Sequence, residues 1–204
     1  NVYAFITPSE FLKNKLALNG FEEKRIHCIP TFTASKTTIG EQQIGSYGLY
    51  FGRVTEEKGV ETVIKAYEKL PEYTVKIMGD DTTDEAKRLK KYVENHKMKN
   101  VEFLGFKSGE ELENVIKGAR FTLIPSIWYD NLPNTALESF QYSKPVIASN
   151  IGSLPELVID GENGYLFKPS NVEDLIKKIK MLDDDTLVKK MGQASRKRLE
   201  SRFA

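Results

Sequence analysis

The sequence is poor in the residues that build disulfide frameworks and metal centres. Its 204 residues include a single cysteine, Cys28, and two histidines, His27 and His96, which lie far apart. One cysteine cannot form a disulfide within the chain, and this spacing of Cys and His matches no known metal-ligand pattern. We therefore expect no metal ion and no cofactor, and a reducing, cytoplasmic setting is favoured.

Long apolar runs and an excess of either charge are also missing. No run approaches the roughly 20 apolar residues of a membrane-spanning helix, and no signal peptide is visible. The 30 Lys and Arg residues nearly balance the 29 Asp and Glu residues, which leaves a formal net charge of +1. This balance gives no bulk reason to expect nucleic acid as a partner, so any recognition must be local.

The first 45 residues are predicted to form a small unit followed by a linker. Residues 2–7 are typical of a strand, Ser9 and residues 10–18 of a capped helix, and residues 25–30 of a second strand. Thr31 to Ser46 is rich in Thr, Ser, Gly and Gln, as linkers are. Because Asn1 lies in an apolar run without an initiator Met, we expect residues 1–45 to be the tail of a missing N-terminal domain.

Residues 46–204 alternate between predicted strands and helices, which indicates a second domain. Short apolar runs bounded by turn residues predict strands near residues 49–51, 73–79, 101–106, 121–126, 145–149 and 164–167. Amphipathic segments predict helices in the four gaps between the first five of these strands, and at residues 171–182 and 185–202. This pattern is typical of an α/β fold, a Rossmann-like doubly wound parallel sheet of about six strands with helices on both faces. A ligand is expected at the carboxyl ends of the strands.

The segment from Pro125 to Glu138 joins a strand to a turn and a helix. Pro133 suits the first turn of that helix, whose free N–H groups and positive dipole favour an anion. Asp130 lies before the helix and Glu138 lies inside it, roughly 7.5 Å along the axis from Pro133. Such a separation suits contacts to two parts of an extended ligand. Two alternatives stay open, namely that Asp130 caps the helix and that Glu138 is a surface residue.

Two cations flank another predicted helix start. Arg53 follows Gly52 at the end of a strand, and Lys58 precedes Gly59 and the next helix. Arg can grip a diphosphate with two parallel hydrogen bonds, and Lys can act as a point charge. The alternative is that Arg53 pairs with Glu56 or Glu57 on the surface while Lys58 is solvated.

Five motifs in order resemble one enzyme family. They are Gly52-Arg53 with Lys58-Gly59, Pro125-Ser126, Asp130 with Glu138, Gly152-Ser-Leu-Pro-Glu156, and Asp160-Gly-Glu-Asn-Gly164. Together they resemble the donor-binding C-terminal half of the retaining "group 1" glycosyltransferases, of the glycosyltransferase family 4 type, which have the two-domain GT-B fold. The resemblance covers about residues 46–200. Residues 6–12 with Ile29-Pro30 are similar to the tail of that family's N-terminal domain.

The resemblance implies a role for each matching residue. Gly52, Arg53 and Lys58 would hold the donor diphosphate and stabilise the leaving group. Asp130 would contact the transferred sugar, and Glu138 would bind the ribose. The implied catalytic residues are Arg53, Lys58 and Asp130, and the implied donor-binding residues are Gly52, Arg53, Lys58, Gly79, Gly105, Phe106, Asp130, Asn131, Leu132 and Glu138. The chain departs from the family at Asp130, where a Glu is usual, and at Gly79-Asp80-Asp81, where Gly-x-Gly is often found.

The resemblance implies a glycosyltransferase that moves a sugar from a nucleotide-diphosphate sugar to a glycan or lipid-linked acceptor, without a metal ion. The acceptor site would lie on the missing N-terminal domain, so this fragment should bind donor and turn over little or nothing. Two other functions stay open, a nucleotide-sugar epimerase of the same fold and a non-catalytic nucleotide-binding or scaffolding module. The last helix presents either a solvated face or a weak contact to anionic lipid at the inner membrane face through Lys189, Lys190, Arg196, Lys197, Arg198 and Arg202.

Overall fold

A computed structural model describes residues 2–33 and 43–203 of the chain. Its larger part is built on a six-stranded sheet in the order β5-β4-β3-β6-β7-β8, and every neighbouring pair is parallel. The strands are β3 (Tyr47–Phe51), β4 (Thr74–Met78), β5 (Val101–Gly105), β6 (Ala119–Ile124), β7 (Val146–Ser149) and β8 (Gly164–Phe167). The order reverses between β3 and β6. In open α/β sheets a ligand binds at such a switch point.

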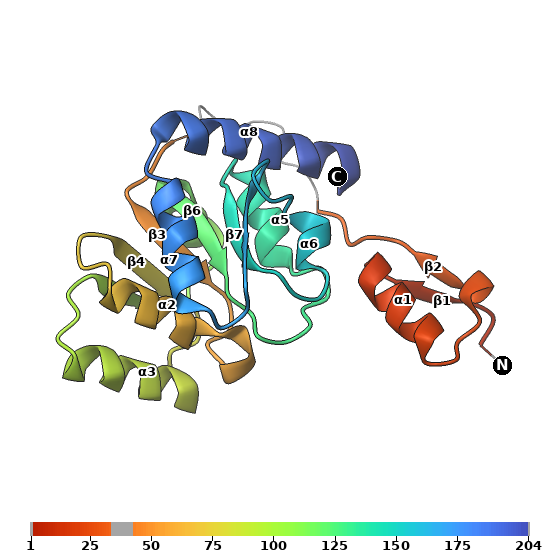
Figure 1. The fold of residues 1–204 in the computed structure, drawn as a ribbon, viewed down its shortest axis with the longest axis horizontal. Helices are drawn as coiled ribbons and strands as arrows, with labels where there is room; N and C mark the ends of the chain where they lie inside the picture. Colours follow the sequence, from red (N-terminus) through yellow and green to blue (C-terminus); the bar gives the residue numbers. More distant parts are fainter. Residues whose placement is uncertain (1, 34–42, 204) are drawn as a thin grey trace.

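Helices cover both faces of this sheet (Figure 1). One face packs against α2 (Val60–Glu68), α3 (Asp84–Asn95) and α7 (Val172–Met181). The other packs against α4 (Gly109–Gly118), α5 (Asn134–Gln141) and the short α6 (Leu154–Leu157). The C-terminal helix α8 (Asp185–Arg202) crosses the end of the domain, and it contributes to the core on both faces.

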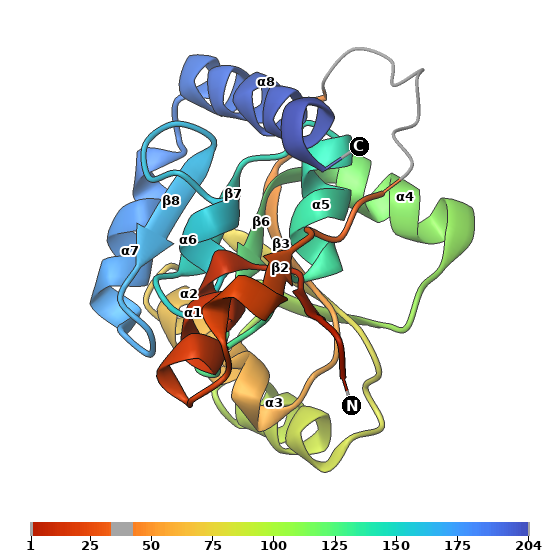
Figure 2. The ribbon, with the colours of Figure 1, turned by 90° about the vertical axis from the view of Figure 1, so that its right-hand side faces the viewer.

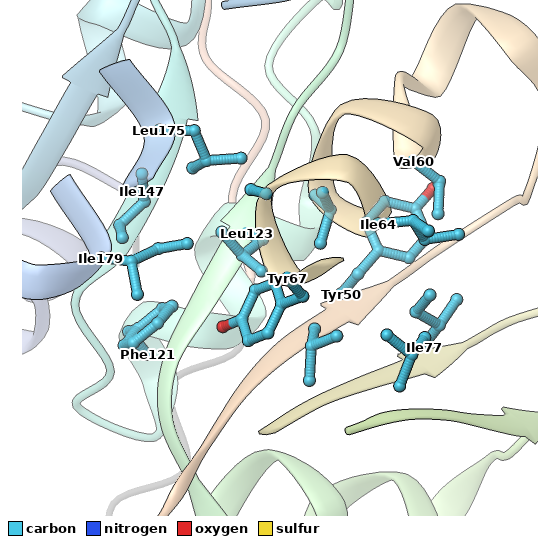
Figure 3. Close-up of a cluster of buried hydrophobic side chains, with 14 of the residues drawn as sticks. Tyr50, Val60, Ile64, Tyr67, Ile77, Phe121, Leu123, Ile147, Leu175 and Ile179 are labelled. Carbon is cyan, nitrogen blue, oxygen red and sulfur yellow. The ribbon is translucent and has the colours of Figure 1, made fainter. Parts of the chain in front are cut away.

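The largest core lies between the sheet and helices α2 and α7 (Figure 3). Strand residues alternate between the two faces, so Tyr50 of β3 points into this core while Leu49 and Phe51 point into the opposite one. The same alternation holds in β7, where Ile147 faces the large core. Burial on both faces explains why these strands are nearly continuous apolar runs in the sequence.

Residues 2–33 form a small βαβ unit beside the domain (Figures 1 and 2). Strands β1 (Phe5–Thr7) and β2 (Ile26–Cys28) pair in parallel, and α1 (Glu10–Leu18) connects them. The unit contacts the domain at the start of α1, where Ser9 Oγ lies 2.7 Å from Asn131 Oδ1. The carboxylate of Glu156 accepts the backbone N–H groups of Glu10 and Phe11 at 2.9 and 2.6 Å. Asn131, in the turn before α5, and Glu156, in α6, therefore help to hold α1.

The predicted fold class is confirmed, with small shifts at the boundaries. The β-α-β unit and the six parallel strands occur where the sequence patterns predict them. Pro133 is not in the first turn of α5, because its ψ of 130° is extended and the helix begins at Asn134. Residues 34–42 of the predicted linker lie outside the described residues, and the boundary at residue 45 stays a prediction.

Candidate functional site

A cleft of two adjoining cavities lies at the carboxyl ends of the central strands. The larger cavity has a volume of about 600 Å³ and the smaller about 250 Å³. Phe51, Gly52, Arg53 and Thr135 line both of them. Since β3 and β6 are the strands at which the sheet order reverses, the cleft opens where a doubly wound sheet usually binds its ligand.

Glycines let the backbone of two strand ends come together at the cleft. Gly52 has a φ of 147°, a conformation that side chains rarely allow. A Cβ on Gly79 would lie 1.9 Å from the carbonyl oxygen of Gly52, so no other residue fits there. The hydroxyl of Tyr50 donates to the carbonyl of Arg53 at 2.5 Å and fixes the turn that follows β3.

Arg53 stands in the shared part of the cleft with its side chain 74% exposed. The surface pairing that the sequence left open is present, since one guanidinium nitrogen lies 3.8 Å from Glu57 Oε1. An exposed ion pair of this length is worth little and leaves the guanidinium free to move onto a ligand.

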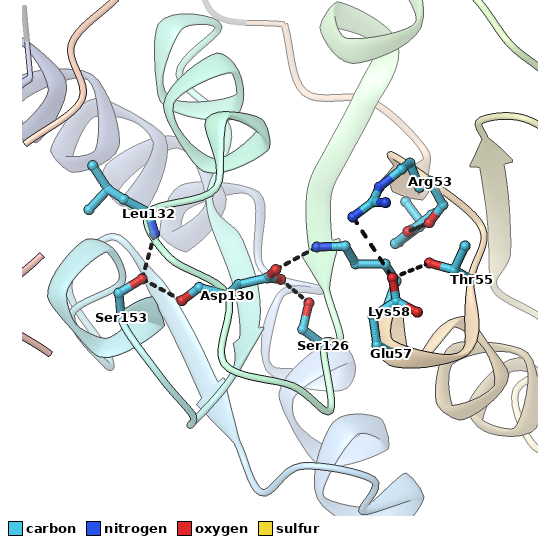
Figure 4. Close-up of polar contacts among 9 residues, drawn as sticks. Arg53, Thr55, Glu57, Lys58, Ser126, Asp130, Leu132 and Ser153 are labelled. Carbon is cyan, nitrogen blue, oxygen red and sulfur yellow. Dashed lines mark hydrogen bonds and ion pairs between the residues drawn. The ribbon is translucent and has the colours of Figure 1, made fainter. Parts of the chain in front are cut away.

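Lys58 and Asp130 face each other across the smaller cavity (Figure 4). Lys58 Nζ lies 2.5 Å from Asp130 Oδ1, and both side chains are largely buried, at 20% and 14% exposure. Ser126 Oγ donates to the other carboxylate oxygen of Asp130. The alternative of a solvated Lys58 is therefore wrong. The alternative that Asp130 caps α5 is wrong too, because that helix start has no side-chain cap.

The turn that carries Asp130 rests on Ser153, as Figure 4 shows. Ser153 Oγ accepts the N–H of Leu132 at 2.7 Å and donates to the carbonyl of Asp130 at 2.8 Å. Leu132 has a φ of 52°, which is uncommon for a residue with a side chain. Gly152 approaches the turn so closely that a Cβ there would lie 3.0 Å from the carbonyl oxygen of Asp130.

Glu138 lines the larger cavity together with Phe106 and Asp80. It is half-buried, so the alternative of an ordinary surface residue is wrong. Burial raises the pKa of its carboxyl group above 4.5. Among the described residues its carboxylate has no hydrogen-bond or ion-pair partner. An unpaired, partly desolvated carboxylate in a cavity is a strong acceptor for ligand hydroxyl groups.

The structure brings most of the predicted site residues together. Those that line the cleft are Gly52, Arg53, Lys58, Gly79, Phe106, Asp130, Asn131 and Glu138. Gly105 and Leu132 do not line it. Gly105 ends β5 with a φ of 68°, and Leu132 is buried in the core beneath α5. Both are placed to shape the backbone beside the cleft.

Sequence reasoning gave no role to Ser126 and Ser153, although both lie in motifs that carried the resemblance. A serine near a ligand site has no distinctive spacing, and these two act through residues that the fold brings near them. Only their position beside Pro125 and Gly152 in those motifs indicates in the sequence that they belong to the site.

Residues 38–198 match the family described as Glycosyl transferases group 1. An uncharacterized glycosyltransferase of Methanocaldococcus jannaschii, MJ1178, is 30% identical over 190 residues, which is 92% of this chain and 52% of that protein. This chain belongs to the group 1 glycosyltransferases. A glycogen synthase of Mycobacterium tuberculosis is 31% identical over 182 residues, which is 84% of this chain and 41% of that enzyme. The chain thus spans about half the length of the curated relatives it matches.

Solved glycosyltransferase structures share the fold of this group 1 chain. Anabaena HepE in complex with UDP superposes with a TM-score of 0.89 at 20% identity, over 99% of this chain and 60% of that one. At this identity the likeness bears on the fold alone. Within residues 2–33 and 43–203, no helix combines the length and apolar character that a bilayer crossing requires.

Proposed function

We propose that this group 1 chain binds the nucleotide-diphosphate sugar that serves as donor in a retaining glycosyl transfer. The observation that carries the proposal is the single cleft in which Arg53 is shared by two cavities of different chemistry. Glu138 stands in the larger cavity, and Lys58 stands with Asp130 in the smaller one. This order of groups matches a ligand with hydroxyls, then a diphosphate, then a second set of hydroxyls.

The larger cavity suits the nucleoside. Its walls include the apolar side chains of Met78, Leu112 and Phe106, which can pack against a base, while Glu138 can accept hydrogen bonds from ribose hydroxyls. HepE, a structural neighbour, has been solved with UDP and with UDP-glucose. Those complexes support a nucleotide donor for this chain.

The smaller cavity suits the diphosphate and the transferred sugar. Asn134 and Thr135 of the first turn of α5 line it, and a helix start offers free N–H groups and a positive dipole to an anion. Lys58 places an ammonium group there beside Asp130, and Arg53 can swing in from its exposed pair with Glu57. Asp130 and Asn131 follow along the wall and can receive sugar hydroxyls.

In the proposed reaction the bond between the anomeric carbon and the donor phosphate breaks, and its electron pair stays with the nucleoside diphosphate. An acceptor hydroxyl forms the new bond to that carbon on the same face and gives its proton to the departing phosphate. Arg53 and Lys58 stabilise the charge that develops on the phosphate. With two cations and a helix start at that position, the proposal requires neither a metal ion nor a nucleophile from the protein.

For the whole protein we propose a glycan or lipid-linked acceptor, bound by the half of the family's length that this chain does not span. The reaction would take place in the cytoplasm or at the inner face of the membrane, where the exposed lysines of α8 can meet anionic headgroups. The chain of 204 residues is then expected to bind donor without appreciable transfer.

Calorimetric titration with UDP, GDP and ADP and with their glucose or mannose conjugates tests the proposal. We expect one nucleotide family to bind. Arg53→Ala should weaken it about 10- to 100-fold, because a charge-assisted contact is lost. Glu138→Ala should weaken it about tenfold through the ribose hydroxyls.

Arg88→Ala is the matched control, because Arg88 is an exposed arginine of α3 that pairs with Glu61 and Glu85 outside the cleft. It should bind like wild type. No binding to any nucleotide by the folded protein would favour a scaffolding module instead. Conversion of the bound sugar to an epimer, seen by NMR, would indicate an epimerase.

A further inference from the structure

Ser153 is fully buried, yet its side chain makes two hydrogen bonds to the backbone of the turn between β6 and α5. The carbonyl of Asp130 accepts from Ser153 Oγ at 2.8 Å and from the backbone N–H of Ser153 at 3.3 Å. The N–H of Leu132 donates to the same Oγ at 2.7 Å. The Ser153 hydroxyl is therefore hydrogen-bonded to the peptide groups on both sides of Asn131.

These contacts determine the direction of the N–H group of Asn131. A trans peptide is planar, so the carbonyl of Asp130 and the N–H of Asn131 point in opposite directions. The carbonyl points at Ser153, and the N–H consequently points away from it. Among the described residues this N–H has no acceptor, and Asn131 lines the smaller cavity beside Lys58 and Asp130.

The turn would not hold this shape by its own preference. Leu132 has a φ of 52°, and a residue with a side chain adopts this conformation only where its surroundings impose it. Its surroundings here are the Ser153 hydroxyl on the N–H and the core that buries the side chain. The core contacts fix where Leu132 lies, and the hydroxyl fixes how its peptide is turned.

We propose that Ser153 is a positioning residue for the transferred sugar. It keeps the peptide between Asp130 and Asn131 turned so that the N–H of Asn131 and the carboxylate of Asp130 together meet the sugar hydroxyls of the donor. This inference rests on the proposed function and adds to it which residue shapes the sugar subsite. Ser153 touches no ligand itself, and it does not line either cavity.

Ser153→Ala tests this role in the full chain by calorimetry with UDP, UDP-glucose, GDP, GDP-mannose, ADP and ADP-glucose. For the nucleotide family that binds wild type, we expect the sugar conjugate to bind about tenfold more weakly, as when one hydrogen bond is lost. The free diphosphate should bind within about twofold of wild type, because its contacts lie on Arg53, Lys58 and α5. A loss of stability alone would move both ligands together.

Two other buried serines supply matched controls. Ser195 in α8 donates to the carbonyl of Asn163 at 3.0 Å, and Ser149 at the end of β7 has a buried hydroxyl without a partner among the described residues. Ser195→Ala and Ser149→Ala should leave the ratio of the two affinities unchanged. Equal weakening of both ligands by Ser153→Ala, or no weakening, would overturn the positioning role.

A second measurement uses wild type alone and so does not depend on the folding of a variant. In ¹⁵N-correlated NMR spectra, saturating UDP-glucose, or the sugar conjugate that binds, should shift the Asn131 amide well beyond the shift caused by the free diphosphate. Identical shifts would overturn the proposal. If wild type binds no nucleotide at all, the proposed function fails first and the role of Ser153 fails with it.

Discussion

Lys58 and Asp130 form an ion pair in the cleft, whereas Glu138 stands in the neighbouring cavity without a partner among the described residues. Both arrangements follow from burial, because a charge taken out of water needs either a counter-charge or hydrogen-bond donors. For Lys58 and Asp130 the protein supplies the counter-charge. For Glu138 the donors must come from water or from a ligand.

Replacement of Glu138 by Gln should stabilise the free protein at neutral pH. Burial raises the folded-state pKa of Glu138 above 4.5, so ionisation of this group opposes folding. The free energy of unfolding of the wild type therefore falls as the pH rises through the raised pKa of Glu138, whereas that of Glu138→Gln does not. We expect a higher melting temperature than that of wild type at pH 7, and a difference that disappears as the pH falls below 4.5.

Thermal unfolding of both proteins between about pH 3.5 and 8 measures this difference. Glu94→Gln, at an exposed glutamate of α3, serves as the control and should show no such pH dependence. A Glu138→Gln variant that melts below wild type at pH 7 would contradict the argument.

At the residue scale, the sequence predicted that the charged groups of the cleft lie at one edge of the sheet but not that Lys58 pairs with Asp130. Arg53, Lys58, Asp130 and Glu138 each follow a strand or sit near a helix start, and the parallel sheet gathers those positions at one edge. The pairing of Lys58 with Asp130 spans 72 residues and depends on the distance between two loops. No local pattern encodes such a distance.

Helix α1 belongs to the N-terminal unit, but a residue of the domain helps to cap it. Ser9 accepts the N–H of Leu12 at 3.1 Å, and Glu156 accepts those of Glu10 and Phe11. Caps of this kind satisfy N–H groups that a helix start leaves free, and a negative charge there also meets the helix dipole. Docking of the unit therefore adds a second cap, Glu156, to the start of α1.

Glu156→Gln should loosen that start. The amide replaces one carboxylate oxygen by a donor, so one of the two backbone N–H groups loses its acceptor. We expect amide hydrogen exchange at Glu10 and Phe11 to become about fivefold faster, which corresponds to a cap worth roughly 1 kcal/mol. Strand amides of β3 and β6 should be unaffected.

Asp184→Asn is the corresponding change at the start of α8, where Asp184 Oδ1 accepts the N–H groups of Thr186 and Leu187. Asp184→Asn should speed amide hydrogen exchange only within α8. Unchanged exchange at Glu10 and Phe11 in Glu156→Gln would show that Ser9 and side-chain packing hold α1 without the carboxylate.

At the element scale, long amphipathic or apolar patterns predicted nearly all strands and helices, with boundaries within a few residues of those observed. Helix α8 was predicted at 185–202 and occurs at Asp185–Arg202. The short α6, of four residues, was missed because one turn of helix carries no periodic pattern. The docking of α1 was missed as well, since Glu156 lies 145 residues from Phe11 and only the fold brings them together.

At the scale of the whole molecule, one buried lysine ties distant parts of the chain together through hydrogen bonds. Lys144 is 1% exposed, and its ammonium group donates to the carbonyls of Gln43, Lys117 and Ala119 at 2.7, 2.6 and 2.7 Å. These carbonyls belong to the segment that enters the domain, to the end of α4 and to the start of β6. Lys144 thus joins two separate stretches of the chain, at Gln43 and at residues 117–119, to its own.

Lys144→Met should lower the free energy of unfolding by about 2–4 kcal/mol, because the carbonyls lose their donor while the apolar stem is kept. Urea denaturation followed by circular dichroism measures the change. Lys189→Met, at an exposed residue of α8, is the control and should lie within about 0.5 kcal/mol of wild type. A similar small effect of Lys144→Met would contradict the structural role of its three hydrogen bonds.

The docked βαβ unit lies against the loop that carries Asp130 and Asn131, which we propose to contact the transferred sugar. Ser9 contacts Asn131, and the ring of Phe11 lies 5.0 Å from that of Tyr129. Binding free energies are reciprocal, so if the docked unit favours the loop conformation that holds a sugar, a bound sugar must favour docking by the same amount. The nucleotide sugar would then act as a clamp between the two parts of the chain. Slower amide hydrogen exchange at Glu10 and Phe11 in the presence of the nucleotide sugar would report that coupling.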